Sequence, residues 1–392
     1  MPASKNFCFS FGTILLTMIG FNKPYLTGKE LDYIRDAVER EKLSGNGYYT
    51  QQCHQFFTDH YGFAKTLLTQ SCTAALEMAA LLLNVGPDDE IILPSFTFVS
   101  TANAFALRGA KLIFADSEKN TPNLDVNHVR SLITAKTKAI VAVHYAGVAC
   151  DMEPLMKLAG ENSCFVVEDA AQAIDSYYRG KPLGSIGHLA CFSFHETKNI
   201  IAGEGGMLVV NDEQFAGRAE VLWEKGTNRL AFFRGEVDKY GWIDGGSSFL
   251  PSEMTAAFLW AQLQELDVIQ KRRLAVWNRY QQGFQFQVRE GHFFLPVIPA
   301  YATNNAHMFY IVCRTEDERN SIMAHLKGQD IQAIFHYLPL HSSPYFHSKY
   351  NGRALSEADR FSGCILRLPF HTELTDPEID RVIKSIHQFY NS

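Results

Sequence analysis

Residues 193–199 read Ser-Phe-His-Glu-Thr-Lys-Asn, after a short apolar run and before a glycine-rich turn at residues 203–206. Upstream, residues 166–172 read Val-Val-Glu-Asp-Ala-Ala-Gln. Both stretches begin as buried strands of an open α/β sheet would, and such sheets bind ligands beyond the carboxyl ends of their strands. Lys198 and Asp169 follow these two ends. We therefore expect their side chains to share one ligand site.

A lysine amine and a nearby carboxylate are the pair that pyridoxal 5′-phosphate requires. The amine bonds to the cofactor aldehyde, and the carboxylate keeps the pyridine nitrogen protonated so that the ring can absorb carbanion charge. Taken singly, Lys198 reads as a surface residue and Asp169 as a helix cap. Their pairing, with glycines beside the lysine, favours a cofactor site instead.

A candidate phosphate turn lies upstream at Ser71, Cys72 and Thr73, between a predicted strand and a predicted helix. Free N–H groups and the positive helix end favour an anion there, although an ordinary N-cap is the alternative. Ser193 is a candidate second hydroxyl for the same phosphate. Cys72 is also a candidate nucleophile, but Lys198 already supplies one.

The rest of the chain predicts two domains, because 392 residues exceed the usual size of one hydrophobic core. Short β-rich runs alternate with helical patterns between residues 65 and 211, which indicates a mostly parallel sheet flanked by helices. A second, α+β unit is expected from a long helical region at 252–285, followed by strand 307–314, helix 316–327, strand 331–337 and helix 376–390.

Four runs in this order resemble one family: residues 71–76, 94–98, 168–172 and 193–199. The chain, from about Gly20 onward, is similar to the sugar aminotransferases of the DegT/DnrJ/EryC1/StrS family, which are fold-type I pyridoxal phosphate enzymes. The resemblance implies a large α/β domain with a mostly parallel seven-stranded sheet, which we place at residues 18–260, and a smaller α+β domain at 261–392. Residues 1–17 are expected to be an extension outside the fold, since they are too short to span a bilayer and lack a clear signal cleavage site.

The resemblance also implies further cofactor contacts. Phe96 matches an aromatic residue that stacks on the cofactor, with an ordinary core phenylalanine as the alternative, and Gln172, one helical turn after Asp169, is expected to reach its phenolic oxygen. The family takes a phosphate ligand from a neighbouring subunit, commonly an asparagine; this chain offers Ser248 there. His195 is a third catalytic candidate beside Lys198 and Asp169, with a packed histidine as the alternative.

Other runs, at residues 224–229, 233–235, 305–310 and 335–337, resemble members that act on dTDP-4-keto-6-deoxyglucose. They imply transfer of an amino group from L-glutamate to C4 of this nucleotide sugar, for surface polysaccharide or antigen synthesis. The implied substrate contacts are Asn228, Arg229, His336 and His341. The alternatives are amination at C3, a sugar linked to another nucleotide, a sugar dehydratase and a non-catalytic sensor. The related dehydratase has a histidine at the position of the lysine, so Lys198 favours amino transfer over dehydration.

Composition excludes several partners. A net charge of -6 gives no basic field for nucleic acid or for an anionic membrane. The eight cysteines are scattered and read as reduced thiols of a cytoplasmic protein. The 14 histidines form no HxxxH or HExxH motif, so no metal site is expected. The family builds its active site between two subunits, which implies a homodimer with shared sites.

Overall fold

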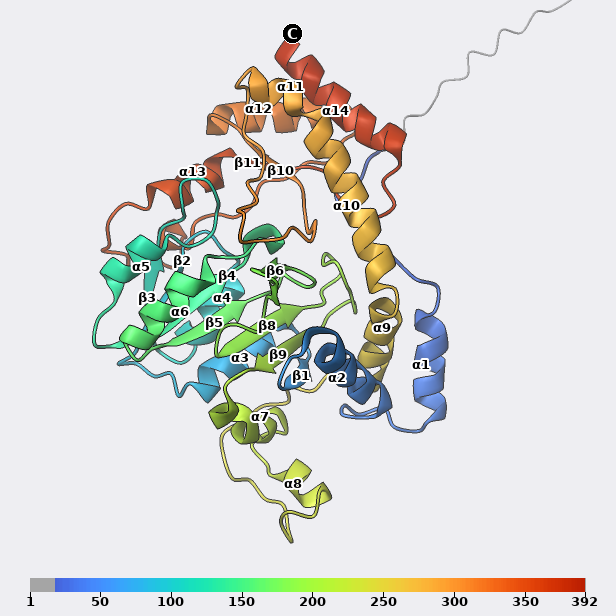
Figure 1. Cartoon of the computed structure of the whole chain (residues 1–392), viewed down its shortest axis with the longest axis vertical. Helices are drawn as coiled ribbons and strands as arrows, with labels where there is room; N and C mark the ends of the chain where they lie inside the picture. Colours follow the sequence, from blue (N-terminus) through green and yellow to red (C-terminus); the bar gives the residue numbers. More distant parts are fainter. Residues whose placement is uncertain (1–17, 392) are drawn as a thin grey trace, which may run out of the picture.

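A seven-stranded sheet forms the centre of the protein in the computed structural model, which describes residues 18–391 (Figure 1). The prediction for residues 1–17 therefore lies outside the described residues. The strands of the sheet are β1 (Thr66–Thr69), β2 (Glu90–Pro94), β3 (Lys111–Ala115), β4 (Thr137–Val143), β5 (Phe165–Asp169), β8 (Leu189–Ser193) and β9 (Gly206–Val210).

The sheet has the strand order β1-β9-β8-β5-β4-β2-β3. Strands β3, β2, β4, β5 and β8 run parallel, whereas β9 is antiparallel to both of its neighbours, β8 and β1. The predicted α/β class and the mostly parallel seven-stranded sheet are thereby confirmed. Because β5 and β8 are adjacent and parallel, the residues that follow them emerge at the same edge.

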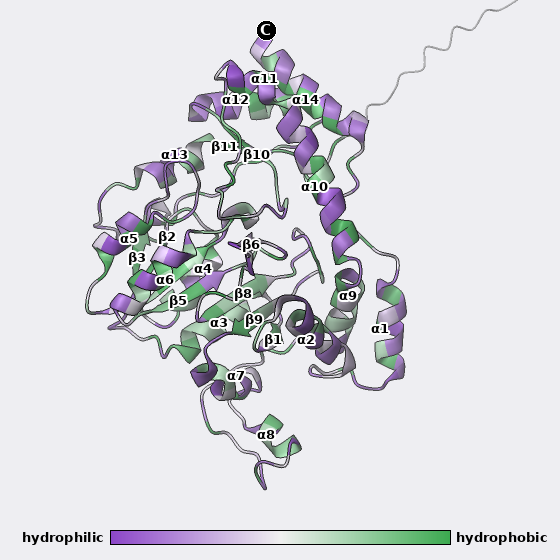
Figure 2. Cartoon of the chain, viewed as in Figure 1, coloured by the Kyte–Doolittle hydropathy of each residue, from purple (hydrophilic) through white to green (hydrophobic). Residues whose placement is uncertain are grey.

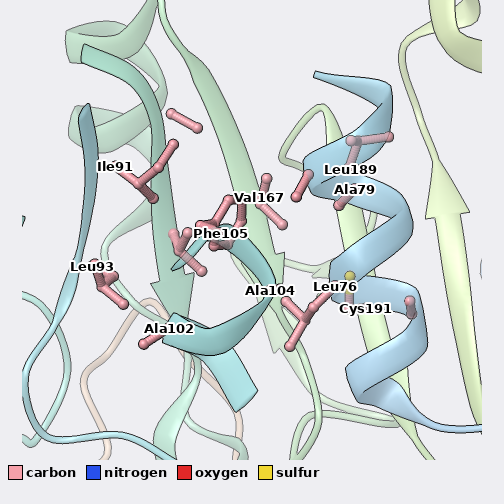
Figure 3. Close-up of a cluster of buried hydrophobic side chains, with 14 of the residues drawn as sticks. Leu76, Ala79, Ile91, Leu93, Ala102, Ala104, Phe105, Val167, Leu189 and Cys191 are labelled. Atoms are coloured by element: carbon pink, nitrogen blue, oxygen red, sulfur yellow. The ribbon is translucent and has the colours of Figure 1, made fainter. Parts of the chain in front are cut away.

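Alternate residues of the strands pack on opposite faces of the sheet. Leu67 and Ile91 lie in one buried cluster, and their neighbours Leu68 and Ile92 lie in the other. Figure 3 shows part of the first cluster, where side chains of α3 and α4 meet those of β2, β5 and β8. The helices of that face are α3 (Cys72–Leu82), α4 (Val99–Ala106) and α7 (Ala216–Trp223); the other cluster includes residues of α1 (Glu30–Glu39), α2 (Tyr48–Tyr61), α5 (Val126–Leu132), α6 (Met152–Glu161) and α9 (Glu253–Leu263).

The C-terminal part has a buried cluster of its own, to which the described N-terminal end also contributes Ile19. The predicted long helix is present as two helices that break at Gln264 and Glu265, and α9 packs its buried residues with those of α2. The sheet's cluster continues past this break to Leu266 and Ile269, whereas the C-terminal cluster includes this helix only from Val276 onward. The division at residues 260 and 261 stays a prediction. The elements after the break are α10 (Leu266–Gly283), α11 (Gln285–Arg289), β10 (Tyr310–Val312), α12 (Glu316–Lys327), α13 (Ser356–Cys364), β11 (Ile365–Arg367) and α14 (Asp376–Asn391).

The strand predicted at residues 331–337 does not form. Ile331 pairs with Ile19, and only three residues later Ile334 pairs with Arg367, so no partner runs along the whole segment. The strand predicted at 307–314 is shortened to β10 for a similar reason, because its partner β11 is itself three residues long. Helix α13 was not predicted.

An arm formed by residues 224–248 extends beyond α7, away from the C-terminal helices (Figure 1). Two isolated bridges close its base, Glu224 with Ser248 and Thr227 with Trp242. It contains α8 (Arg229–Phe233). The remaining short elements of the described chain are β6 (Tyr177–Tyr178), β7 (Lys181–Pro182) and the 3₁₀ turns η1 (Tyr145–Gly147), η2 (Glu213–Phe215) and η3 (Leu340–Ser342).

Hydropathy follows these layers. Figure 2 shows hydrophobic residues concentrated in the central strands and hydrophilic faces on α10, α12 and α14. No helix within residues 18–391 combines the length and the apolar character needed to cross a bilayer. All seven cysteines of the described chain are free thiols.

The edge strand β1 is protected on its outer side by two side chains. The Nε2 atom of His54 accepts a hydrogen bond of 3.0 Å from the Leu68 N–H, and the indole N–H of Trp223 donates to the Leu68 carbonyl at 2.6 Å. Unpaired strand groups are thereby satisfied without another strand. Burial, with a smaller effect of the Lys65 charge, lowers the pKa of His54 to about 4. Protonation of Nε2 would also remove the acceptor of this hydrogen bond.

This pKa makes the protein less stable in mild acid. The folded-state pKa lies below the ordinary value of 6.5, so the unfolded chain binds more protons and stability falls as the pH drops from 7 to 5. Replacing His54 with Gln keeps an acceptor but removes the titration, and should reduce the loss of unfolding free energy over this interval by about 2 kcal/mol. Urea unfolding at both pH values measures this difference; equal losses in the two proteins would contradict the assignment.

Candidate functional site

Lys198 lies in a tight loop directly after β8. Its N–H donates to the His195 carbonyl at 2.9 Å, and the next residue, Asn199, ties the loop to Gln270 of α10 and to the Asn305 carbonyl, at 2.9 and 2.8 Å. Burial of the amine lowers the pKa of Lys198, although Cys72 and Asp169 nearby act to raise it. The loop therefore presents an amine that loses its proton more readily than a surface lysine.

Asp169 ends β5, the strand beside β8, and is 5% exposed. One carboxylate oxygen accepts a hydrogen bond of 2.7 Å from the Thr101 hydroxyl, and the other accepts one of 3.2 Å from the Ala171 N–H. Burial raises the pKa of this carboxyl, while these hydrogen bonds and the Lys198 charge oppose the rise. A cationic partner such as a protonated ring nitrogen would complete the environment of the carboxylate.

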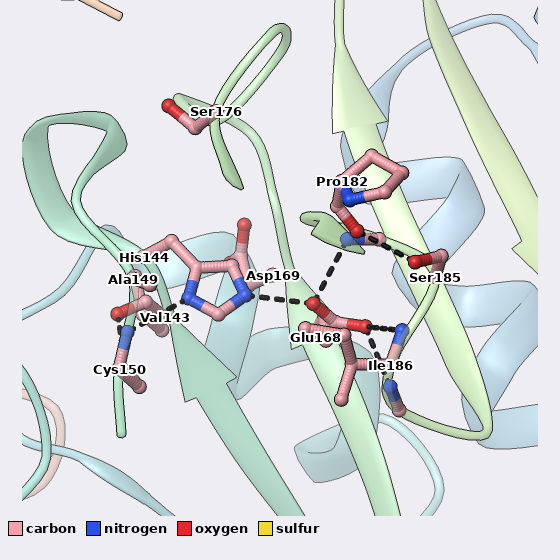
Figure 4. Close-up of polar contacts among 12 residues, drawn as sticks. Val143, His144, Ala149, Cys150, Glu168, Asp169, Ser176, Pro182, Ser185 and Ile186 are labelled. Atoms are coloured by element: carbon pink, nitrogen blue, oxygen red, sulfur yellow. Dashed lines mark hydrogen bonds and ion pairs between the residues drawn. The ribbon is translucent and has the colours of Figure 1, made fainter. Parts of the chain in front are cut away.

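Beneath Asp169, its neighbour Glu168 is held in a fully buried network (Figure 4). One carboxylate oxygen pairs with His144 Nε2 at 2.9 Å and accepts from the Gly184 N–H at 2.9 Å. The other oxygen accepts from the N–H groups of Ile186 and Gly187 at 2.8 and 2.6 Å. Burial raises the pKa of Glu168, but these hydrogen bonds outweigh it and hold the pKa below its ordinary value.

The candidate phosphate turn opens helix α3, as expected. Ser71 caps the helix by accepting the Ala74 N–H at 3.1 Å, and the Thr73 hydroxyl donates to Ser100 at 2.8 Å. The backbone of the turn packs so closely on Gly206 that a Cβ there would lie 2.3 Å from the Ser71 carbonyl carbon. Burial raises the pKa of the Cys72 thiol well above its ordinary value, which argues against Cys72 as a nucleophile.

An aromatic wall closes the other side of the site. The ring of Phe96 is 1% exposed and lies 5.3 Å from Tyr145 and 5.8 Å from Tyr337 between centroids. Gln172 donates to the Tyr337 hydroxyl at 3.2 Å and accepts the Ala146 N–H at 2.6 Å. The helical turn predicted between Asp169 and Gln172 is wrong, because the chain continues from β5 in turns.

The site contains more buried positive charge than its carboxylate balances. The charge of the Arg367 guanidinium acts to lower the pKa of Lys198 and of His336. The guanidinium also donates a hydrogen bond of 2.9 Å to the His336 ring. In addition, His336 Nδ1 and Arg367 Nε are buried without hydrogen-bond partners within residues 18–391. An amine, a buried carboxylate, a helix N-terminus and spare donors match the aldehyde, ring nitrogen and phosphate of pyridoxal phosphate, so the residues present fit this cofactor.

Three other predicted residues have partners of their own, although Ser193 pairs with Gly206, against which the phosphate turn packs. His195 bonds to Thr197 at 2.9 Å and lies 3.7 Å from Glu204, and Ser193 accepts the His195 N–H at 3.4 Å. His341 is buried, with Nδ1 at 2.7 Å from the Ser95 hydroxyl and Nε2 at 3.6 Å from Asp359. The structure thus places His341 behind the loop that carries Phe96.

The three predicted residues of the arm contact other residues of the arm or of its base. Asn228 accepts the Gly241 N–H at 2.8 Å, and Arg229 lies over the Phe233 ring at 5.2 Å. Ser248 is exposed at the base of the arm, beside Phe249, whose carbonyl accepts the N–H of Gln70 just before the phosphate turn. Their roles stay predictions.

Sequence reasoning missed Thr101, Tyr145, Tyr337 and Arg367. Thr101 carried a usable signal, because its position at the start of a helix after β2 places it at the same sheet edge as Asp169. Arg367 carried none, since it ends a strand of only three residues far along the chain. Within residues 18–391, no group of three or more His, Cys, Asp or Glu side chains is arranged to hold a metal ion.

The Glu168 network gives a direct stability prediction. In Glu168→Gln, the amide NH₂ group would face donors that now meet an oxygen, which leaves buried N–H groups unsatisfied and should cost about 2 to 5 kcal/mol. The control is Glu161→Gln, at an exposed residue whose side chain lies 3.9 Å from Lys157, with a change of no more than about 0.5 kcal/mol. Thermal unfolding of both variants measures the difference, and equal midpoints would show that the network is unimportant.

Comparison with known proteins identifies the family. The family model described as the DegT/DnrJ/EryC1/StrS aminotransferase family matches residues 24–387. The spore coat polysaccharide biosynthesis protein SpsC of Bacillus subtilis is 32% identical over 93% of this chain and 95% of its own length. GDP-perosamine synthase of Escherichia coli O157:H7 is 32% identical over 94% of this chain and 98% of its own.

Solved structures agree. The aminotransferase TlmJ from Streptoalloteichus hindustanus is 29% identical and superposes with a TM-score of 0.87 over 95% of this chain and 99% of its own. A structure described as a sugar aminotransferase, Spr1654 from Streptococcus pneumoniae in its PLP form, is 25% identical, with a TM-score of 0.86 over 95% and 99% of the two chains. The chain therefore belongs to the DegT/DnrJ/EryC1/StrS family and is a pyridoxal phosphate-dependent sugar aminotransferase.

Proposed function

We propose that this enzyme transfers the amino group of L-glutamate to C4 of dTDP-4-keto-6-deoxy-D-glucose, giving dTDP-4-amino-4,6-dideoxy-D-galactose for a surface polysaccharide or antigen. We place it in the cytoplasm, as a homodimer with shared active sites. The observation that carries the reaction is the pair of Lys198 and Asp169 at the ends of adjacent parallel strands. The choice of sugar rests on the runs at residues 224–229 and 335–337.

Pyridoxal phosphate, when bound, supplies the electron sink for a carbanion at the amino-bearing carbon. Asp169 holds the proton on the ring nitrogen, and Thr101 fixes the direction of this carboxylate through its 2.7 Å hydrogen bond. The residues that we propose hold the rest of the cofactor are Ser71, Cys72 and Thr73 at α3, Ser193 at the end of β8, Phe96 and Gln172 beside the ring, and Ser248 contributed by a second subunit.

Lys198 has two tasks in this proposal. It holds the cofactor by a covalent bond, and once the substrate amine displaces it, Nζ moves the proton to and from the substrate carbon. The second task needs an unprotonated amine, and burial lowers the pKa of Lys198 in that direction. Its anchored neighbour Asn199 limits how far the freed amine can move away.

A GDP-linked keto sugar is the second candidate substrate. Two of the relatives, from Escherichia coli and Caulobacter vibrioides, are named GDP-perosamine synthases, and each is 32% identical to this chain. Substrate choice depends on a few pocket contacts, so this identity does not decide between the nucleotides.

The arm supports the proposal of shared sites. It extends beyond α7 and carries α8, the helix that Arg229 begins, away from the C-terminal part (Figure 1). We infer that Asn228 and Arg229 serve the site of a second subunit. Its apolar side chains have no cover, since Phe233 is 66% exposed and Trp242 is 84% exposed. Exposed apolar groups of this kind mark an interaction surface, and a two-fold dimer would cover both arms in the same way.

Lys198→Ala tests the reaction. The purified enzyme should show a visible cofactor band that bleaches with L-glutamate and returns with the keto sugar, and NMR of the product should show an axial amine at C4. The variant should lose both the band and turnover, whereas Lys157→Ala, at an exposed lysine, should keep them. Turnover by the Lys198 variant would contradict the mechanism, and bleaching that only a GDP sugar reverses would replace the substrate.

Subunit mixing tests the shared sites. Lys198→Ala subunits keep an intact arm, and Arg229→Ala subunits keep an intact lysine, so each variant should be nearly inactive alone. Random mixing makes half of the dimers mixed, each with one complete site, so activity should return to about one quarter of the wild-type value. If the mixture exchanges subunits but its activity does not recover, Arg229 does not act across the interface.

A further inference from the structure

Arg367, at the end of β11, is a buried cation without a carboxylate partner. The residue is 9% exposed, and no Asp or Glu of the described chain lies within ion-pair distance of its guanidinium. Its NH1 group donates to His336 and its plane lies over the ring of Phe21 at 4.8 Å, but its Nε–H has no hydrogen-bond partner. A buried, unbalanced charge is costly, and proteins retain one where a ligand supplies the opposite charge.

The contact with Arg367 also defines the proton on His336. A guanidinium can only donate, so His336 Nε2, 2.9 Å from Arg367 NH1, must accept. Burial lowers the pKa of His336, and the charges of Arg367 and Lys198 lower it further, so the ring is neutral. A neutral ring that accepts at Nε2 carries its hydrogen on Nδ1, and this atom is buried without a partner.

Tyr145 adds a third unused donor to the same place. Its ring centroid lies 6.2 Å from that of His336, its side chain is 2% exposed, and its hydroxyl has no hydrogen-bond partner within residues 18–391. Burial raises the pKa of Tyr145 well above its ordinary value, so the hydroxyl keeps its hydrogen, although the Arg367 charge acts in the opposite direction. Three donors from three separate segments therefore lack acceptors, and one of them is cationic.

We propose that Arg367, His336 and Tyr145 form the subsite for the α-carboxylate of the amino donor. The proposal rests on the proposed transamination and extends it to residues of this chain. A carboxylate carries one charge and two oxygens with about four acceptor positions, which matches one guanidinium, one ring N–H and one hydroxyl. It also satisfies all three donors at once.

The place of the cluster favours a carboxylate over a sugar diphosphate. In an α-amino acid the carboxylate is bonded to the carbon that loses its proton, so it must bind beside the cofactor. The cluster borders that place, because Tyr337, next to His336, accepts a hydrogen bond of 3.2 Å from Gln172, and the Tyr145 ring lies 5.3 Å from that of Phe96. The Arg367 charge also acts to lower the pKa of Lys198. In a nucleotide sugar the diphosphate is separated from C4 by the sugar ring. A diphosphate also needs more than one cation, and the two other buried arginines of residues 18–391 already have partners. Arg273 donates to the carbonyls of Ala306 and His307 at 3.0 and 2.6 Å, and Arg319 pairs with Glu316 at 3.0 Å.

Calorimetric binding to the cofactor-loaded protein tests the subsite without turnover. The probes are 2-oxoglutarate, which has the carboxylate of the donor, and dTDP, which has the diphosphate of the acceptor. Arg367→Gln should raise the Kd for 2-oxoglutarate by about 10- to 100-fold, and Tyr145→Phe by about 3- to 10-fold. The Kd for dTDP should stay within about twofold in both. Arg279→Gln, which removes an exposed arginine that pairs with Asp380, is the control and should change neither.

Unfolding separates binding from a purely structural role. Without 2-oxoglutarate, Arg367→Gln should unfold at the same or a higher temperature than the wild type, because it removes an unbalanced buried charge. The stabilisation that 2-oxoglutarate gives the wild type should be absent from the variant. Arg367→Lys keeps the charge but not the planar donors, so its affinity for 2-oxoglutarate should lie between those of the wild type and Arg367→Gln.

Several results would overturn the subsite. They are no binding of 2-oxoglutarate to the wild type, an unchanged Kd in Arg367→Gln, a loss confined to dTDP, or a lower unfolding temperature with equal loss of both probes. These results are distinct from failure of the proposed function. If the protein binds 2-oxoglutarate through Arg367 but does not aminate the dTDP sugar, the subsite stands and the proposed sugar substrate is wrong. If Arg367→Gln aminates that sugar at the full rate with an unchanged KM for glutamate, the proposed substrate stands and the subsite is wrong.

Discussion

Two reactive groups must be kept out of water at one sheet edge, and most of the surrounding structure serves this requirement. The Asp169 carboxylate and the Lys198 amine are both destabilised as charges by burial, which raises the pKa of the first and lowers that of the second. Their mutual attraction offsets part of this cost. The parallel pairing of β5 and β8 makes the arrangement possible, because it brings the carboxyl ends of the two strands, Asp169 and Ser193, to the same edge of the sheet.

Support for these groups comes from residues that do not touch the chemistry. Glu168 organises the loop at residues 184–187 and binds His144 beneath Asp169, while Asn199 ties the lysine loop to α10. The C-terminal part closes the site with His336, Tyr337 and Arg367. These residues come from two segments, which pair through the bridge between Ile334 and Arg367. Loss of contact between the two parts would therefore expose the amine to water and raise its pKa.

The sequence predicted the sheet well because its strands depend on local patterns. The same patterns placed Asp169 and Lys198 after adjacent strands, and their chemical roles stay predictions. Apolar runs of strand length mark β5 and β8, and the residues after them can be named at once. Gln172 was harder, since the segment after β5 contains good helix formers, yet its side chain is used to bind the Ala146 N–H in a turn. Residues 331–337 read as a strand, but the chain offers two short partners instead of one long one. Arg367 could not have been found, because only the fold brings it beside His336 and Lys198.

The central claim is that Lys198 is the residue that holds pyridoxal phosphate. The most direct test is borohydride reduction of the cofactor-loaded enzyme, which makes the lysine–cofactor bond permanent, followed by mass spectrometry of its peptides. One labelled peptide is expected, containing residues 193–199, with the added mass on Lys198. A label on another lysine, or no label in protein that has bound the cofactor, would contradict it.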